Sequence, residues 1–437
     1  MHKPVSGFSK MSKQDKIDWL ARTYFSNNTE AINILRQYWN SDTKLQQLHD
    51  DFTENAVSNY YLPFGIAPNF LINDRLYTIP MVIEESSVVA AASNAAKFWL
   101  NKGGFHAEVF STEKNGQIHL DYFGEKNVLF DFFQTIKPRL FDSVSEIEKN
   151  MKKRGGGLKD IELIDSSGSL DGYFQLHCTF NTRDAMGANF INSCLETIAT
   201  TLEEECLGYE PFLKNSQPPK VVLSILSNYV PECLVKAWVS CPVSALLKDA
   251  TDAKVFAQDF VRAVEIANTE IRRAVTHNKG IMNGVDAVVV ATGNDFRAVE
   301  AGVHAYASRS GAYASLTKAT IENEEFRFSI EIPLALGTVG GLTSLHPMVK
   351  FALQLLHKPS AEELMQIVAV AGLAQNFAAI RSLVTTGIQK GHMKMHLMNI
   401  LNQLEATSEE KEKAVRHFVK NTVSHSAAVE FIKKLRA

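Results

Sequence analysis

The stretch from Thr276 to Glu300, THNKGIMNGVDAVVVATGNDFRAVE, constrains this chain more than any other segment. It is dense in titratable side chains and in small or amide residues that let a backbone approach a ligand. The first group is His277, Lys279, Asp286 and Asp295, and the second is Gly280, Asn283, Gly284 and Gly293. The β-branched run at 288–290 predicts a buried segment, which we interpret as a strand, although a helix fits the same pattern.

A helix is predicted directly after this run. Apolar residues follow Asn294 at helical spacing, namely Phe296, Val299, Val303 and Tyr306. Asp295 then falls in the first helical turn, where a carboxylate is favoured by the helix dipole. The pattern alone fits a turn, a buried strand and a capped helix with one solvated lysine equally well.

Composition excludes several classes of protein. The 437 residues suffice for two or three domains, and the net charge of −3 gives no reason to expect a nucleic-acid partner. The longest apolar candidate, Ser87–Leu100, is shorter than the roughly 18 residues of a membrane span and is interrupted by polar residues. The N-terminus has no apolar signal region, and the five cysteines form no C-x-x-C pair. We therefore expect a cytoplasmic protein without a membrane segment.

A second candidate site lies at Glu84 and Glu85. Two serines, Ser86 and Ser87, separate these glutamates from a run of helix-forming residues. The simplest interpretation is that serine caps the helix and that the glutamates lie at its positive end.

Two glycine-containing turns are candidates for nucleotide binding. A predicted strand at 173–180 runs into RDAMGAN at 183–189, and a helix follows. Free N–H groups and the helix dipole at such a turn favour a diphosphate. No G-x-G-x-x-G opens a βαβ unit, so the Rossmann signature is absent. GTVGG at 337–341 follows a predicted strand at 326–333, and a tight turn explains it equally well.

His392 and His396 lie one helical turn apart, yet no third ligand or HExxH context accompanies them, so we expect no metal site. Arg273 precedes Lys279 closely enough to bind a substrate carboxylate in bidentate fashion.

Eight motifs together resemble one family. THNKGIMNG and ATGNDFRAVEAG, with ENAVS, PMVIEESSVVAAAS, RDAMGAN, GTVGG, GLAQN and KGHM, are similar to the class II (soluble, bacterial-type) hydroxymethylglutaryl-CoA (HMG-CoA) reductases, in the family's order. The resemblance implies reduction of HMG-CoA to mevalonate and CoA, through mevaldehyde, by two hydride transfers from NADH or NADPH. The reaction is reversible, so the direction used by the cell stays open.

The resemblance also implies an α+β fold. A large mixed α/β domain, 1–111 and 218–386, would contain an inserted small ferredoxin-like, non-Rossmann NAD(P)H-binding domain at 112–217. A C-terminal helical flap would follow at 387–437. The functional unit would be a homodimer with shared sites, possibly assembled into a hexamer.

Four catalytic roles follow from the resemblance. Lys279 would hold the reacting oxygen and Glu85 would deliver protons. Asp295 would orient both of these groups, and His392, on the flap, would protonate the departing CoA thiolate. Position 398 is methionine, where related class I enzymes carry a regulatory serine six residues after this histidine, so control by phosphorylation is not expected.

The implied binding residues fall into two sets. The substrate set is Glu54, Asn55, Ser87, Arg273, Asn283 and Asn376. The cofactor set is Glu148, Arg183, Asp184, Ala185, Met186, Gly187, Ala188, Asn189, Gly337, Thr338, Val339 and Gly340. This chain departs from the family at Val57, Ser58 and Ser86, where isoleucine, glycine and proline are usual.

Glu148 falls on the position that discriminates between the two cofactors. A carboxylate there accepts hydrogen bonds from the ribose of NADH and repels a 2′-phosphate, so we expect NADH. The nearby cluster Lys149, Lys152, Lys153 and Arg154 could instead receive that phosphate, and Glu148 could equally be one charge on a solvated helix.

An alternative function is a non-catalytic acyl-CoA or nucleotide sensor on the same fold. Such a protein would lack at least one of the four catalytic groups. All four are present at matching positions, which favours the enzyme.

Overall fold

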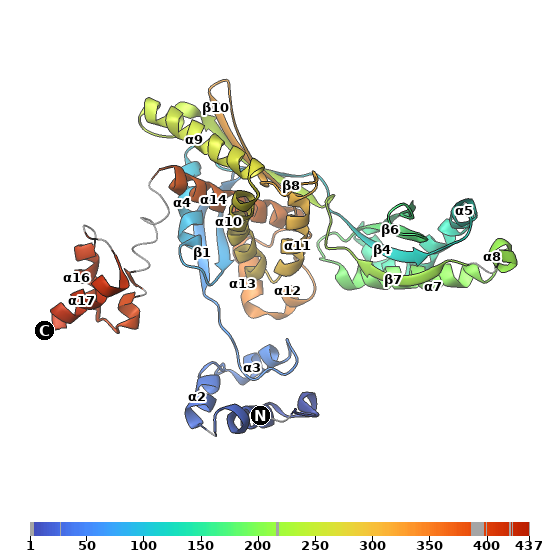
Figure 1. The fold of residues 1–437 in the computed structure, drawn as a ribbon, viewed down its shortest axis with the longest axis horizontal. Helices are drawn as coiled ribbons and strands as arrows, with labels where there is room; N and C mark the ends of the chain where they lie inside the picture. The colour runs from blue at the N-terminus through green and yellow to red at the C-terminus, as the bar shows by residue number, and fades with distance from the viewer. Residues whose placement is uncertain are drawn as a thin grey trace. The chain divides into compact units, whose positions relative to one another are not determined.

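The computed structural model describes residues 4–26, 28–215, 218–385, 397–398, 400–418, 421 and 423–436 (Figure 1). The chain forms two compact units, one ending at Pro63 and the other beginning at Phe64.

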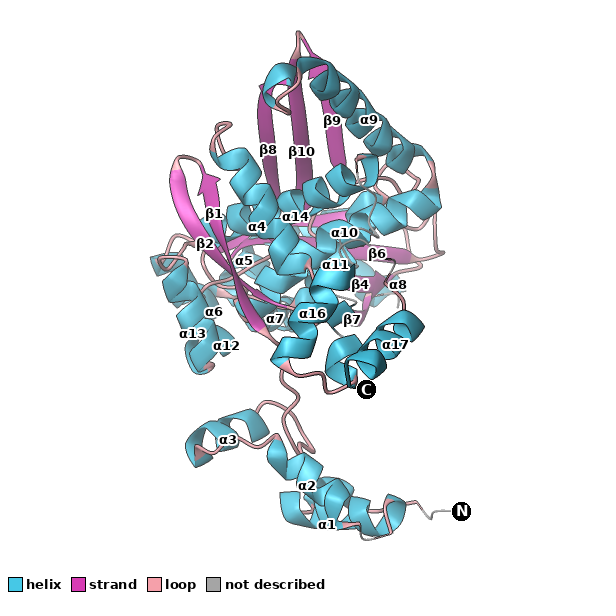
Figure 2. Ribbon diagram, turned by 90° about the vertical axis from the view of Figure 1, so that its left-hand side faces the viewer, coloured by secondary structure: helices cyan, strands magenta, loops and turns pink. Residues whose placement is uncertain are grey.

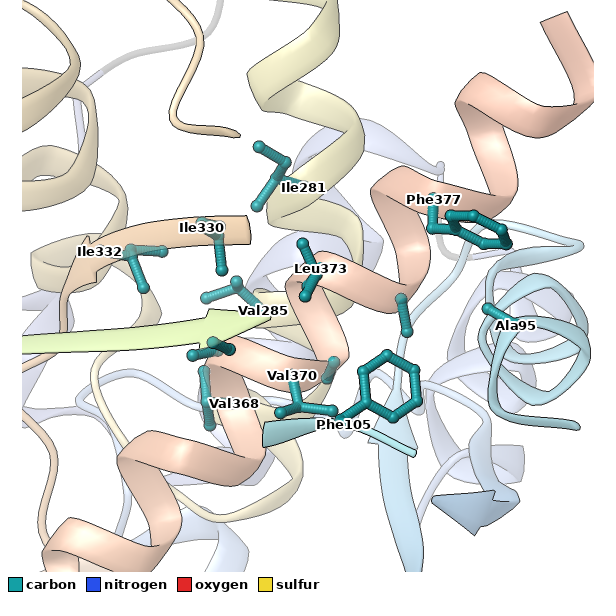
Figure 3. Close-up of a cluster of buried hydrophobic side chains, with 14 of the residues drawn as sticks. Ala95, Phe105, Ile281, Val285, Ile330, Ile332, Val368, Val370, Leu373 and Phe377 are labelled. Atoms are coloured by element: carbon teal, nitrogen blue, oxygen red, sulfur yellow. The ribbon is translucent and has the colours of Figure 1, made fainter. Parts of the chain in front are cut away.

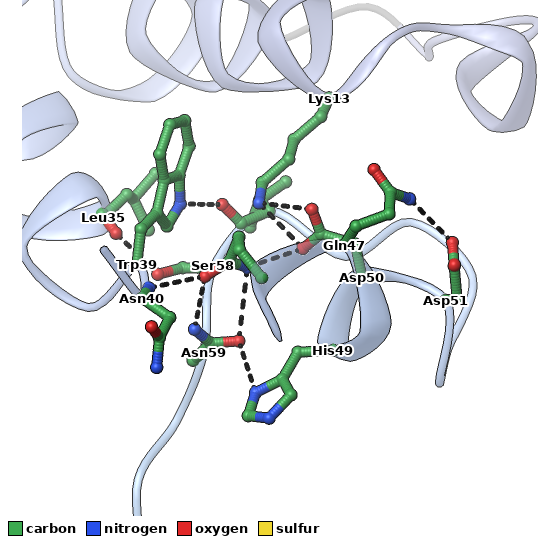
Figure 4. Close-up of polar contacts among 12 residues, drawn as sticks. Lys13, Leu35, Trp39, Asn40, Gln47, His49, Asp50, Asp51, Ser58 and Asn59 are labelled. Carbon is green, nitrogen blue, oxygen red and sulfur yellow. Dashed lines mark hydrogen bonds and ion pairs between the residues drawn. The ribbon is translucent and has the colours of Figure 1, made fainter. Parts of the chain in front are cut away.

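The first unit is helical, with η1 (Phe8–Lys10), α1 (Lys13–Tyr24), α2 (Thr29–Gln37) and α3 (Thr43–Asp50). Polar contacts hold the segment after α3 against these helices (Figure 4). Trp39 Nε1 donates to the carbonyl of Val57 at 3.0 Å, and Ser58 Oγ donates to the carbonyl of Leu35 at 2.6 Å. Ser58, unusual for the family, therefore has a local structural role.

The second unit opens with a hairpin of β1 (Phe64–Ile72) and β2 (Arg75–Val82), and α4 (Val88–Leu100) packs on it. The two residues between the strands, Asn73 and Asp74, have φ of 46° and 63°. Left-handed conformations at both positions match the right-handed twist of a hairpin, and asparagine and aspartate tolerate them well.

The larger sheet has the order β3-β8-β10-β9, and every neighbouring pair is antiparallel. Its strands are β3 (His106–Val109), β8 (Leu234–Pro242), β9 (Thr317–Glu322) and β10 (Glu325–Pro333). Buried and partly exposed residues alternate along β8, so one face of this strand belongs to the core. Figure 2 shows β8, β10 and β9 side by side with α9 alongside.

Helices η2 (Val243–Ala245), α9 (Ala250–Thr269), α10 (Ile271–Ala291), α11 (Phe296–Ala307), α12 (Leu342–Leu345), α13 (Pro347–Leu355) and α14 (Ala361–Val384) complete this part. The strand predicted at 288–290 is wrong, because the three valines continue α10 and lie within or at the edge of the core. Periodicity could not separate a buried strand from one side of a buried helix.

Helix α14 forms the centre of the main core. Figure 3 shows Val368, Val370, Leu373 and Phe377 of this helix among side chains from α4, α10 and β10. By length and composition α14 could cross a membrane. With 24 residues it is longer than the apolar stretch 87–100 that was singled out from the sequence. However, 67% of its most apolar window is buried inside the protein, as in the core helix of a globular domain.

Helices α10 and α14 approach closely through glycine. A Cβ at Gly284 of α10 would lie 2.5 Å from the carbonyl oxygen of Ala371 and 2.8 Å from Cβ of Gln375. A Cβ at Gly372 of α14 would lie 2.8 Å from Cγ2 of Val285 and 3.1 Å from Cγ2 of Ile281, both side-chain atoms of α10. The backbone contact is possible only because neither glycine has a side chain.

The smaller sheet lies between β3 and β8 in the sequence. Its elements are β4 (Glu113–Asp121), α5 (Lys126–Ser143), α6 (Ser145–Lys153), β5 (Gly157–Asp165), β6 (Tyr173–Asn181), α7 (Ala188–Cys206), α8 (Glu210–Asn215) and β7 (Lys220–Leu226). The strand order β5-β6-β4-β7 is antiparallel throughout, and Figure 1 shows α7 along this sheet. A βαββαβ chain in this order has the ferredoxin-like arrangement, and because β7 pairs with β4 the small sheet extends beyond residue 217.

Helices α16 (Ser408–Phe418) and α17 (His425–Arg436) share a small apolar cluster with Leu397, Ile400 and Leu401. Arg436 pairs with Glu410 at 2.7 Å and ties α17 to α16.

The glycine contact gives a prediction about stability. Gly284→Ala should lower the free energy of unfolding by about 1–3 kcal/mol, because the added methyl group would overlap backbone atoms of α14. Gly280→Ala is the matched control on the same helix, since its Cβ would meet no atom within 4 Å. Alanine there should raise stability by up to about 1 kcal/mol. Urea unfolding measures both, and equal stability of the two variants would contradict close packing at Gly284.

Candidate functional site

Lys279 and Glu85 form an ion pair between two different elements. Lys279 lies in α10, and Glu85 lies in the turn before α4. Lys279 Nζ donates to Glu85 Oε2 at 2.6 Å, yet the lysine side chain is 60% exposed and the glutamate 40%. Such an exposed pair contributes at most about 1 kcal/mol to stability, so both groups remain accessible to a ligand.

Ser87 stands at the N-cap position of α4 in a strained conformation. Its φ is 75°, in the left-handed region, and its side chain makes no capping hydrogen bond. The expectation that this serine caps the helix with its side chain is therefore wrong. Backbone strain of this kind costs about 1–3 kcal/mol and concentrates at functional sites, which makes Ser87 a candidate ligand contact.

Arg273 lies about two helical turns before Lys279 on α10. Burial lowers the pKa of its guanidinium, and among the described residues no carboxylate pairs with it. A half-buried cation without a partner is suited to a ligand carboxylate. Asn283 follows Lys279 by one turn and lies on the same side of the helix.

A buried polar network supports the Lys279 helix from behind. His277 Nε2 lies 2.6 Å from Thr317 Oγ1, and Thr317 Oγ1 donates to Asn376 Oδ1 at 3.3 Å. Asn376 Nδ2 donates to the carbonyl of His277 at 3.3 Å. Burial, with the nearby Arg273, lowers the pKa of His277 to about 3, so the imidazole is neutral. The amide of Asn376 is therefore engaged inside the protein.

Asp295 is the N-cap of α11, one residue before the predicted first turn. Its Oδ1 accepts from the backbone N–H groups of Arg297 and Ala298 at 3.1 Å each. In the described part of the chain, no hydrogen bond joins it to Lys279 or Glu85.

Asp295 also borders a cavity of about 270 Å³ between α11 and the smaller sheet. The cavity is mainly apolar, with four polar residues in its lining: Lys114, Ser227, Asn228 and Asp295. Met186 and Ala188 of the RDAMGAN segment line the opposite side. Ser227 and Asn228 are not among the site residues predicted from the sequence.

The RDAMGAN segment forms a tight turn at the start of α7. Gly187 has φ of 87°, and a Cβ there would lie 2.4 Å from Cγ2 of Thr182. No side chain caps the first turn of this 19-residue helix. The free helix end is thus available to an anion, as the sequence predicts, and Asn189 and Ala188 lie in its first turn.

The two predicted nucleotide motifs meet in space although they are far apart in the sequence. Thr338 N and Val339 N both donate to the carbonyl of Asp184, at 2.8 and 3.2 Å. The carboxylate of Asp184 accepts from the backbone N–H of Ala361, at the start of α14. A Cβ at Gly337 would lie 2.3 Å from the backbone nitrogen of Met186. Asp184 and Gly337 therefore hold the RDAMGAN and GTVGG segments together. An isolated parallel β-bridge between Ala185 and Val339 adds to this contact.

A buried lysine that the sequence analysis missed holds this junction. Lys114 in β4 is only 4% exposed. Its Nζ donates to Thr182 Oγ1 at 2.6 Å, to the carbonyl of Ala185 at 2.8 Å and to that of Met186 at 3.1 Å. The carbonyl of Leu336, before GTVGG, lies 3.5 Å away. Burial lowers the pKa of this lysine. No motif in the sequence marked it, because its partners are mainly backbone carbonyls.

Glu148 is buried rather than solvated. Its side chain is 1% exposed, Oε1 accepts from the backbone N–H of Leu158, and Oε2 lies 2.7 Å from Nζ of Lys152. Gly157, with φ of 122°, leaves room for this carboxylate, which therefore helps to hold the turn into β5. Arg183 Nε also donates to this turn, at the carbonyl of Gly155, over 2.9 Å.

Three predicted site residues lie outside this second unit or outside the described residues. Glu54 and Asn55 belong to the first unit, where both are exposed and Asn55 has φ of 60°. His392, with His396, lies outside the described residues. Among the residues that are described, no group of three histidine, cysteine, aspartate or glutamate side chains could hold a metal ion.

Comparison with known proteins supports the resemblance found in the motifs. Residues 13–397 match the family described as hydroxymethylglutaryl-coenzyme A reductase. The chain is 35% identical over 439 residues to the 3-hydroxy-3-methylglutaryl-coenzyme A reductase of Archaeoglobus fulgidus, covering 100% of this chain and 96% of that protein. It is 36% identical over 441 residues to the probable reductase of Borreliella burgdorferi, covering 99% and 97%.

Solved structures agree with this assignment. The reductase of Streptococcus pneumoniae has a TM-score of 0.73 at 33% identity, covering 99% of this chain and 100% of that one. A structure of the same class II enzyme bound to NADPH, in open conformations, has a TM-score of 0.72 at 33% identity, covering 98% and 100%. The motifs, the fold with its two four-stranded sheets and these likenesses over the full length lead to one conclusion: the chain belongs to the hydroxymethylglutaryl-coenzyme A reductase family, and its likeness is to the class II type.

Proposed function

We propose that the chain is an HMG-CoA reductase whose reacting centre is the Lys279–Glu85 pair. The observation that carries this proposal is that a lysine and a carboxylate from separate elements lie 2.6 Å apart while both remain exposed. An ion pair that served only stability would need neither the strained Ser87 nor Arg273, which pairs with no carboxylate among the described residues. An acyl substrate with a free carboxylate needs a polar pair at its reacting carbonyl and a separate cation, such as Arg273, at its carboxylate.

The chemistry assigned to these residues follows from the charge that develops. Hydride addition to the thioester carbonyl forms a hemithioacetal oxyanion, which collapses to mevaldehyde and CoA thiolate, and a second addition forms the alkoxide of mevalonate. Lys279 would stabilise the oxygen in both steps. Glu85, in contact with Lys279, would supply the proton to that oxygen. We assign protonation of the thiolate to His392.

The substrate carboxylate would lie against Arg273 and Ser87, with Asn283 on the same side of α10. We assign Glu54 and Asn55 to the substrate site from the family motif alone. For Asn376, the buried contacts with His277 and Thr317 support an indirect role, in which it holds the helix of Lys279.

A nicotinamide cofactor, when bound, supplies the hydride. The tight turn at Gly187 and the uncapped start of α7 fit a diphosphate. The cavity bordered by Asp295 also touches Met186 and Ala188, so its lining residues would hold the nicotinamide end. The smaller sheet, which includes β7, would then form the nucleotide-binding domain together with its helices. The S. pneumoniae enzyme solved with NADPH supports this class of cofactor.

We propose that Asp295 completes the site from its place on the cavity wall.

We also propose that the functional unit is a homodimer and that three such dimers could assemble into a hexamer. Exposed large apolar side chains gather on α12 and α13 and the loop before them, namely Val339, Leu342, Leu345, Met348 and Phe351. An apolar surface of this kind is typical of an interface between copies. Light scattering on the purified protein tests it, and a monomer at assay concentration would refute it.

We retain a cytoplasmic location as a proposal. The sensor alternative is not favoured, because the Lys279–Glu85 pair is assembled and exposed. Assays of HMG-CoA reduction and of mevalonate oxidation would show which direction the enzyme favours.

The division of labour between His392 and Lys279 is testable. His392→Ala should lower the rate of HMG-CoA reduction by roughly 10²-fold or more, yet largely spare reduction of added mevaldehyde, since only the first substrate has a thiolate to protonate. Lys279→Met should abolish both reactions, because both place charge on the same oxygen.

Two measurements control that experiment. Lys279→Met should change the free energy of unfolding by less than about 1 kcal/mol, because the pair is exposed. The unmutated protein should oxidise two equivalents of reduced cofactor per HMG-CoA, measured by absorbance at limiting substrate. Equal damage to both half-reactions in the histidine variant would refute its role, and a ratio of one with aldehyde accumulating would refute the four-electron reaction.

We further propose that the chain prefers NADH, and that Glu148 acts through Lys152. By pairing with Lys152 at 2.7 Å, the buried carboxylate would hold the cation that a 2′-phosphate requires. Glu148→Gln keeps an acceptor for the N–H of Leu158 and releases Lys152. This variant should raise kcat/KM for NADPH relative to NADH by roughly tenfold, corresponding to about 1.4 kcal/mol.

Lys152→Gln in the Glu148→Gln background is the matched control and should reverse the gain. If the unmutated protein already prefers NADPH, or if the ratio does not move, Glu148 is not the discriminator, and Lys153 and Arg154 are tested next.

A further inference from the structure

A pair of carboxyl groups lies between the two helices that carry the proposed catalytic residues. Asp286 lies on α10, two helical turns after Lys279, and Glu300 lies on α11, between one and two turns after Asp295. The two carboxyl groups are within hydrogen-bonding reach of each other, and Oδ1 of Asp286 is buried without a hydrogen-bond partner in the described part of the chain. Two carboxylates cannot hydrogen-bond to each other unless one of them carries a proton.

The second carboxyl group continues into a chain of polar contacts. Glu300 Oε2 lies 2.7 Å from Nε2 of His304, one turn further along α11. His304 Nδ1 lies 2.7 Å from the hydroxyl of Tyr313, whose segment follows α11. His304 is about one-third exposed, so the chain Asp286–Glu300–His304–Tyr313 leads from a buried carboxyl group towards solvent.

The surrounding groups decide which carboxyl group holds the proton. Glu300 has a histidine beside it, which favours its ionised form, and the hydrogen bond from His304 is the main cause of its lowered pKa. In the described part of the chain, no cation acts on Asp286. Burial first, then Glu300 and the more distant Glu84, raise its pKa to about 8.

We propose that Asp286 and Glu300 share one proton at neutral pH and that this hydrogen bond fixes the helix of Lys279 against the helix that begins at Asp295. Asp286 and Glu300 are positioning residues and touch no substrate. The inference rests on the proposed function only where it concerns activity. Its structural part, a proton held between α10 and α11, stands on the contacts described above.

Loss of the proton leaves two adjacent carboxylates between helices that otherwise contact each other over only a short length. The repulsion separates α10 from α11, and Lys279 moves relative to the cavity wall at Asp295. Activity should therefore fall as the pH rises through about 8. One pH unit above that value, the activity should be about tenfold lower than at neutral pH.

The effect of pH on stability has a definite sign. The pKa of Asp286 lies above its ordinary value of 3.8, so between about 4 and about 8 the folded protein holds a proton that the unfolded chain has released. This group therefore makes the folded state progressively less stable as the pH rises through that window. Glu300 titrates below its ordinary value of 4.5 and acts only at the acid end.

The test is Asp286→Asn, in which the amide permanently replaces the protonated acid and donates to Glu300. The difference in Tm between the variant and the unmutated protein should grow from pH 5 towards pH 8 and then level off. The kcat/KM for HMG-CoA should lose its decline above about pH 8. Asp286→Ala, which has no donor, should be less active at every pH. Asp259→Asn, an exposed position on α9, is the control and should leave both profiles unchanged.

Each result decides one part of the proposal. If the Tm of Asp286→Asn depends on pH as in the unmutated protein, no shared proton exists. If the Tm profile changes but the activity profile does not, the proton is shared without positioning Lys279. If the unmutated protein does not reduce HMG-CoA at all, the proposed function fails while the stability result still stands.

Discussion

The contact between helices α10 and α14 is the constraint on which the rest of the second unit depends. Glycine on both helices lets their backbones meet, and this contact brings His277 within reach of Asn376. The resulting buried network fixes the rotation of α10 about its axis. Lys279 and Arg273 then point away from the core, where a ligand can reach them. A bulkier residue at Gly284 would therefore act on the site without touching it.

The ionisable groups of this unit fall into two kinds. Lys279 and Glu85 are exposed to water, whereas Lys114, His277 and Asp286 are partly or wholly removed from it. Burying a charge is costly unless hydrogen bonds replace the lost water. Lys114 obtains three such bonds from the turn before α7, and His277 avoids the cost by staying neutral. The buried groups thus fix geometry, and the exposed groups are left for chemistry.

Much of the fold and part of the site could be predicted from the sequence. Motif order predicted the family and its inserted βαββαβ sheet, and helical spacing after Asn294 predicted α11. Periodicity failed at 288–290, because a valine run is compatible with both structures. The interpretation of Glu148 as a charge on a solvated helix is wrong, because the side chain is buried. The sequence of a polar helix does not show that a later turn covers one of its charged residues. Lys114 stayed hidden because its partners are mainly backbone carbonyls about 70 residues further along the chain.

The insertion of the smaller sheet has a consequence for how the chain folds. β3 and β8 are neighbours in the larger sheet, yet the entire βαββαβ segment separates them in sequence. Closing so long a loop in a disordered chain is entropically expensive. A smaller sheet that forms first brings the ends of β3 and β8 together and shortens the effective loop. The order of assembly would then run from the inside of the sequence outward, and the junction at Lys114 would close last.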